Sequence, residues 1–127
     1  MNKIILLSMI MVSLLLSYDF GNVPEKRLDQ VPKGAPAMVM VGKTKCIWCE
    51  SMAPWIKETK EQYPKSAIYY VNVDNDPLGA INHNISELPV QLFFDANGKE
   101  MGRHIGYLNR EDLLAYLDHY GVISTEP

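Results

Sequence analysis

The chain has 127 residues, of which 47% are hydrophobic and 21% are charged. This length and composition predict one globular domain with its own hydrophobic core, preceded by a leader. The formal net charge is −3 and the sequence contains no run of basic residues, which argues against nucleic acid as a partner. The two cysteines are too few for a disulfide-dense scaffold, so the fold must depend on its core.

The N-terminal residues 1–17 are predicted to be a secretory signal peptide. Lys3 supplies a positive start, and residues 4–16 are apolar apart from two serines. This run is shorter than the ~20 apolar residues that a membrane-spanning helix needs. Ser17 is small, as a cleavage site requires, but Leu15 is not, so an uncleaved N-terminal anchor is the alternative. Both interpretations predict export to an oxidising compartment, in which a cysteine pair can carry out disulfide chemistry.

The next segment, 18–36, is predicted to be a linker with room for one helical turn. Three prolines and a glycine interrupt it, namely Pro24, Pro32, Gly34 and Pro36. Residues 37–121 are predicted to form the folded domain, and residues 122–127 a C-terminal tail.

The domain begins with a continuous apolar run, 37–42, which is typical of a central strand buried on both faces. A helix is predicted over 46–63 with a bend at Pro54, because proline removes one hydrogen bond of the helix. The next predicted strand, 68–74, is rich in tyrosine, valine and isoleucine. Asp76-Pro77 then has the pattern of an N-cap followed by proline, which opens a short helix.

The second half of the domain predicts an antiparallel hairpin and a closing helix. Strands over 90–95 and 101–106 flank Asn97-Gly98, which is a strong signal for a hairpin turn. Asn109 is predicted to cap the last helix, 110–120. The order strand, helix, strand, helix, strand, strand, helix predicts an α/β fold with a mixed central sheet flanked by helices.

Cys46 and Cys49 lie at the start of the first predicted helix of the domain. A spacing of i, i+3 places both thiols on one face of a helix, one turn apart, where they can form a disulfide with each other. At the first turn, the Cys46 sulfur would face unpaired backbone N–H groups and the positive end of the helix dipole. Both favour the thiolate, which is the nucleophile in thiol–disulfide exchange.

Several motifs occur in a particular order and spacing, and together they are more informative than any one of them alone. They are Cys46-Ile47-Trp48-Cys49 after the strand that ends at Gly42, Pro54 five residues after the second cysteine, Leu88-Pro89-Val90, and the hairpin 93–99 followed by Gly106. In these motifs and in element order, residues 37–120 resemble the thioredoxin fold family. With the leader, the resemblance implies an exported, periplasmic thiol–disulfide oxidoreductase that acts on protein cysteines.

The resemblance also implies a role for each motif residue. Cys46 would be the attacking thiol and Cys49 the resolving thiol, which agrees with an exposed residue at a helix start and a more buried one a turn later. Pro89 would be the family's cis-proline facing the cysteine pair, and Leu88 would contact the backbone of a bound polypeptide. Trp48, on an exposed turn between the cysteines, is expected to belong to a docking surface.

The chain departs from cytoplasmic thioredoxins at positions that govern proton transfer. Met40 stands where they carry a buried aspartate, and Tyr70 stands where they carry a lysine. Glu50, directly after Cys49, is the candidate substitute relay, although a glutamate on a helix surface is commonly just solvated. The two residues between the cysteines carry no charge that would stabilise a reduced thiolate, as strongly oxidising members require. We therefore expect a reductase or isomerase-like role rather than that of a primary oxidant.

Three other interpretations stay open from the sequence. The cysteine pair can be a purely structural disulfide, although so short a loop contributes little stability. The protein can be a disulfide-forming oxidant, or a non-catalytic module that binds a peptide in a cleft around Trp48 and Pro89. No metal or organic cofactor is implied, because a zinc site needs two more ligands and the histidines are scattered. The expected partners are protein thiols and disulfides and a membrane-bound electron donor, and the chain is expected to be a monomer.

Overall fold

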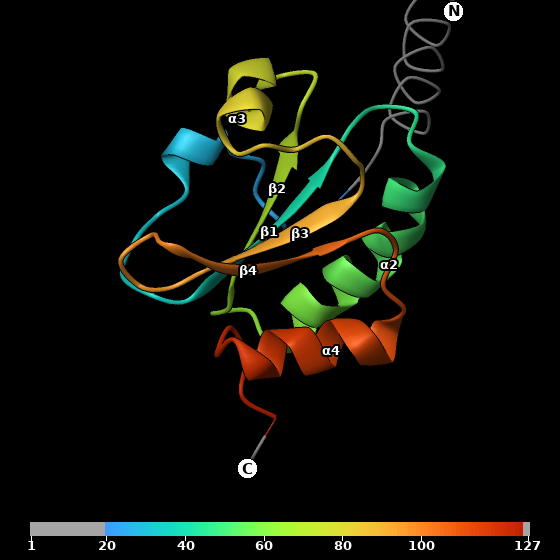
Figure 1. The fold of residues 1–127 in the computed structure, drawn as a ribbon. Coiled ribbons are helices and arrows are strands. Elements are labelled where there is room, and N and C mark those ends of the chain that lie inside the picture. Colours follow the sequence, from blue (N-terminus) through green and yellow to red (C-terminus); the bar gives the residue numbers. More distant parts are fainter. Residues whose placement is uncertain (1–19, 126–127) are drawn as a thin grey trace, which may run out of the picture.

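The computed structural model describes residues 20–125, which contain a four-stranded sheet in the order β2-β1-β3-β4. The strands are β1 (Ala37–Gly42), β2 (Ala67–Asn72), β3 (Val90–Phe94) and β4 (Glu100–Ile105). β1 is parallel to β2 and antiparallel to β3, and β3 is antiparallel to β4 (Figure 1). The predicted mixed sheet of an α/β fold is therefore confirmed.

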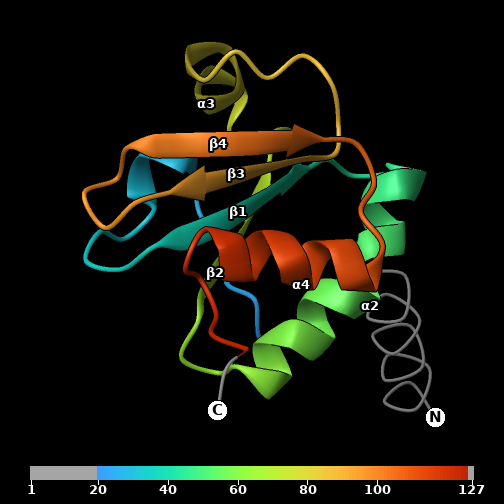
Figure 2. The ribbon, with the colours of Figure 1, turned by 60° about the horizontal axis from the view of Figure 1, so that its bottom comes forward.

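The helices cover both faces of this sheet. They are the 3-10 helix η1 (Leu28–Gln30) and the α-helices α2 (Ile47–Gln62), α3 (Pro77–Asn82) and α4 (Arg110–His119). Figure 2 shows α2 and α4 together on one side of the sheet and α3 on the other. The predicted caps are confirmed, since the side chains of Asp76 and Asn109 accept hydrogen bonds from backbone N–H groups in the first turns of α3 and α4.

Strand β1 is the centre of the core, and all its residues are buried. Because successive side chains of a strand point to opposite faces, Met38 and Met40 pack toward α2 and α4, whereas Val39 and Val41 pack on the other side. This burial on both faces explains why the run 37–42 is apolar without alternation.

The structure differs from the sequence-based prediction of a linker over 18–36. From residue 20 onward this segment packs against the domain, with Phe20, Val23 and Leu28 buried. It also runs along the outer edge of β2, where the Tyr70 N–H donates to the Pro24 carbonyl at 2.9 Å and Lys26 N–H donates to the Tyr70 carbonyl at 2.8 Å. Proline does not prevent this pairing, because Pro24 contributes only its carbonyl oxygen. The segment thereby covers a strand edge that would otherwise be open.

The two ends of the chain are described only in part. The predicted leader, 1–17, lies outside the described residues. No helix within residues 20–125 is both long and apolar enough to cross a membrane. At the C-terminus, Val122 and Ile123 of the predicted tail are buried in the core beside α4, and both backbone N–H groups donate to the Leu117 carbonyl.

The core predicts that replacing two leucines on different helices by alanine changes the free energy of unfolding by very different amounts. Leu117 on α4 is fully buried, whereas Leu78 on α3 is 70% exposed. Leu117→Ala is expected to lower the free energy of unfolding by about 2–5 kcal/mol, because it leaves a cavity under the sheet. The matched control Leu78→Ala should change it by less than about 0.5 kcal/mol. Urea unfolding followed by circular dichroism measures both, and equal losses would contradict this description of the core.

Candidate active site

The sheet topology brings three chain segments together at one end of the strands. In the register of the sheet, Val41 of β1 pairs with Val90 of β3, which in turn pairs with Ile105 of β4. β1 and β4 both finish at this end of the sheet, and β3, which runs the opposite way, begins there. The segments just beyond the sheet are therefore neighbours, namely the turn before α2, the peptide before β3 and the turn after β4.

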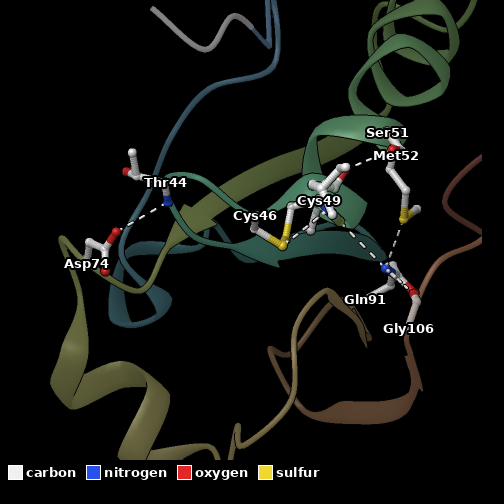
Figure 3. The surroundings of a disulfide bond; sticks show 10 residues. Thr44, Cys46, Cys49, Ser51, Met52, Asp74, Gln91 and Gly106 are labelled. Carbon is white, nitrogen blue, oxygen red and sulfur yellow. Dashed lines mark hydrogen bonds between the residues drawn. A yellow bond between two sulfur atoms is a disulfide. The ribbon is translucent and has the colours of Figure 1, made fainter.

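Cys46 is the N-cap residue of α2, and its backbone is extended. Its Sγ atom accepts a hydrogen bond from the backbone N–H of Cys49 at 3.2 Å, in the place that a serine or aspartate oxygen commonly takes. The turn before it is held by the turn that follows β2, since the Thr44 N–H donates to the Asp74 carboxylate at 3.2 Å (Figure 3). The sequence placed Cys46 inside the helix, whereas the structure places its sulfur over the unpaired N–H groups of the first turn.

The two cysteines form a disulfide, with 5.2 Å between their Cα atoms (Figure 3). Cys46 is half-buried, whereas Cys49, one turn into the helix, is completely buried. An external thiol can therefore approach the sulfur of Cys46 but not that of Cys49. This difference agrees with the order of attack and resolution expected from the sequence.

The surroundings of Cys49 are apolar and tight. A Cβ atom at Gly42 would lie 3.0 Å from the Cys49 sulfur and 3.4 Å from the Tyr70 ring, so only glycine lets the strand pass this closely. Met40 and Met52 belong to the same buried cluster as Cys49. Such surroundings favour the neutral thiol over the thiolate.

Tyr70, which stands where cytoplasmic thioredoxins carry a lysine, is part of this environment. Burial, together with the negative charges of Glu25, Asp74 and Glu50, raises the pKa of Tyr70 to about 12. The side chain is thus uncharged at physiological pH and supplies no cation near the buried sulfur.

Glu50, the predicted relay, is exposed on the first turn of α2. Its negative charge is one of the three that help to raise the pKa of Tyr70. A relay role for Glu50 stays a prediction.

Beside the redox pair lies an open hollow of about 410 Å³. It is lined by Trp48, Leu88, Pro89, Gly106 and Tyr107. The Leu88–Pro89 peptide bond is cis, and Trp48 is 59% exposed. The structure therefore brings together the three residues that the sequence assigned to substrate contact, and it adds Gly106 and Tyr107 from the turn after β4.

Sequence analysis missed two residues of this region, Gln91 and Tyr107. Gln91 is completely buried on β3, and its amide donates to the Gly106 carbonyl at 3.2 Å and contacts the Met52 sulfur at 3.3 Å (Figure 3). The sequence did contain a signal for Gln91, which is the one amide side chain in the otherwise apolar run 90–94. A polar side chain that is buried in such a strand needs specific hydrogen-bond partners. Tyr107 gave no local signal, because a tyrosine in a turn is ordinary.

No group of three or more histidine, cysteine, aspartate or glutamate side chains within residues 20–125 is arranged to hold a metal ion.

Comparison with known proteins assigns the family. Residues 24–121 match the family model described as a thioredoxin-like domain, so the chain belongs to the thioredoxin-like family. The match begins inside the segment that the sequence suggested to be a linker, in agreement with its packing against β2.

Individual relatives are similar over part of their length. Thioredoxin-1 of Saccharomyces cerevisiae is 36% identical over 63 residues, which are 50% of this chain and 60% of that protein. The M-type chloroplastic thioredoxin of Spinacia oleracea is 34% identical over 86 residues, which are 67% of this chain and 47% of that protein. The matches thus span about half to three-fifths of these two relatives.

Solved structures show the same fold. The thioredoxin of Fasciola hepatica has a TM-score of 0.63 at 24% identity, covering 69% of this chain and 83% of its own. A chain from a structure on thiol resolution in a yeast mitochondrial 1-Cys peroxiredoxin has a TM-score of 0.66 at 17% identity, covering 76% of this chain and 94% of its own. A thioredoxin fold with the pair Cys46 and Cys49 fits a thiol–disulfide oxidoreductase.

The unequal burial of the two sulfurs predicts selective alkylation of the reduced protein. Iodoacetamide is expected to modify Cys46 and to leave Cys49 untouched until the protein is unfolded in urea. Mass spectrometry of the native protein, with Cys46→Ser and Cys49→Ser as controls, tests this. Equal modification of both residues would contradict the proposed order of reactivity.

Proposed function

We propose that this protein is an exported thiol–disulfide oxidoreductase that acts on the cysteines of other proteins, as a reductase or isomerase rather than as a primary oxidant. The observation that carries the proposal is the position of Cys46. Its sulfur caps α2, the residue is only half-buried, and it lies in the same turn as Trp48 of the hollow. Its redox partner Cys49 is completely buried.

The reaction follows from this arrangement. In the reduced protein, the Cys46 thiolate attacks a substrate disulfide, a mixed disulfide forms, and one substrate sulfur leaves as a thiolate. Cys49 then loses its proton and attacks the Cys46 sulfur, which releases the second substrate thiolate and forms the Cys46–Cys49 disulfide. Two electrons pass from the cysteine pair to the substrate. Water accepts the Cys49 proton, and Glu50 is the candidate relay.

The uncharged surroundings of the pair support the reducing direction. Strong oxidants of this kind stabilise their reduced thiolate, which raises the potential from about −270 toward about −120 mV. Here Ile47 and Trp48 between the cysteines are neutral and exposed, and Cys49 is enclosed by apolar side chains. Lys45 next to Cys46 is exposed, so solvent and salt weaken its effect.

A polypeptide substrate is supported by the backbone beside the hollow. Within residues 20–125, neither the N–H nor the C=O of Leu88 takes part in a hydrogen bond with the rest of the chain. An extended substrate segment can pair with such a free backbone, as peptides do at open strand edges. Export and a membrane-bound electron donor are part of the proposal and rest on the apolar leader.

Reduction of insulin tests the proposed reaction. The purified protein is expected to accelerate precipitation of insulin chains by dithiothreitol, because Cys46 attacks the interchain disulfides. Cys46→Ser should reduce the rate to that of the uncatalysed reaction, whereas Cys49→Ser should trap a mixed disulfide. Activity that survives Cys46→Ser would refute the enzyme and leave the peptide-binding module as the explanation of the hollow.

Redox titration against glutathione tests the direction. The Cys46–Cys49 couple is expected to have a potential between about −270 and −180 mV, the range of thioredoxin and protein disulfide isomerase. A potential near −120 mV would instead favour a disulfide-forming oxidant.

A further inference from the structure

Tyr107 is fixed in space although it lies in a turn. Its hydroxyl oxygen accepts a hydrogen bond from the indole N–H of Trp55 at 3.1 Å, and its ring centroid lies 5.8 Å from that of Trp48. Trp48 and Trp55 are seven residues apart on α2, so both project from the same face of that helix. The Tyr107 ring is therefore held between two tryptophans.

The backbone under Tyr107 is fixed as well. The Gly106 N–H donates to the Pro89 carbonyl at 2.7 Å, and the Gly106 carbonyl accepts from the Gln91 amide. The orientation of Gln91 is set by its other end, where its oxygen accepts from Nδ1 of His104 at 2.8 Å. Turning the amide over would leave buried polar atoms unpaired, which is unfavourable.

This fixed tyrosine is not part of the core. Tyr107 is 38% exposed and faces the hollow together with Trp48, so two aromatic rings border solvent next to the redox pair. Ile47 and Ile105, which precede the lining residues Trp48 and Gly106 in the chain, are also exposed, at 72% and 53%. Exposed apolar surface that is held rigid beside a reactive group is typical of a binding site.

The chemistry of the lining restricts what can fill it. None of the residues that line the hollow carries a charge, so a charged substrate side chain placed there would lose water and gain no partner. A flat apolar side chain would instead contact the rings of Trp48 and Tyr107. Because Trp48 belongs to the redox turn, the side chain that fills the hollow must lie close to the substrate sulfur that Cys46 attacks.

We propose that Tyr107, held in place by Trp55, is a specificity-determining residue that selects substrate polypeptides with an aromatic or large aliphatic side chain next to the reacting cysteine. This inference rests on the proposed disulfide exchange. It adds a preference that the cysteine pair alone does not produce.

Peptides that differ at one position test the selectivity. Each peptide carries one cysteine as a mixed disulfide with glutathione, and the neighbouring residue is Trp, Leu, Asp or Lys. The wild-type protein is expected to prefer Trp and Leu over Asp and Lys by about tenfold or more in kcat/KM, mainly through KM. Tyr107→Ala should reduce this preference to about twofold or less, whereas Tyr107→Phe, which keeps the ring, should retain most of it.

Two controls separate the hollow from the reaction itself. Ile81→Ala removes an apolar side chain on α3 that is 69% exposed, against 38% for Tyr107, and should leave the preference unchanged. Alkylation of Cys46 by iodoacetamide, which is too small to fill the hollow, should proceed at the same rate in Tyr107→Ala as in the wild type. The preference is a ratio between two peptides on one variant, so a smaller folded fraction does not alter it.

The outcomes distinguish the two proposals. If the wild type reduces none of the peptides, the proposed oxidoreductase function fails. If it reduces all of them at similar rates, or if Tyr107→Ala keeps the full preference, the function stands and the role of Tyr107 is overturned.

Discussion

The interaction on which the site depends is the hydrogen bond from the Cys49 backbone N–H to the Cys46 sulfur. It makes the Cys46 sulfur the N-cap of α2, so the start of the helix fixes the position of the reactive atom. The unpaired N–H groups and the dipole of the first turn act on that sulfur and favour its negative form. One turn later the chain is already inside the core, which is why two neighbouring thiols have such different surroundings.

The sheet provides the frame that holds this cap opposite its neighbours. Because β3 runs antiparallel to both β1 and β4, the start of β3 lies beside the ends of the other two strands, at one end of the sheet. The redox turn, the cis peptide at Pro89 and the turn at Gly106 are therefore joined through strands that are buried or hydrogen bonded along their length. Gln91 connects these parts, since its amide reaches the Gly106 carbonyl and the Met52 sulfur of α2 at once.

The replacements around the buried sulfur of Cys49 both remove a charged side chain. Methionine and tyrosine stand where an aspartate and a lysine would place charges, and the Tyr70 hydroxyl stays neutral with its pKa raised to about 12. The interior behind Cys49 thus consists of polarisable but uncharged groups, including the methionine sulfurs that contact the Gln91 amide.

The amino-acid sequence by itself determined the strands, the helix caps, the hairpin and the position of the cysteine pair. These features follow from local rules of burial period, capping residues and turn residues, as in β1 and at Asp76 and Asn109. Only the tertiary structure decided that residues 20–36 cover the edge of β2, that Gln91 holds Gly106, and that Tyr107 lies between two tryptophans. Each of these depends on contacts between segments far apart in the chain, and the hydrogen bonds and ring contacts that create them leave no periodic pattern in either segment alone.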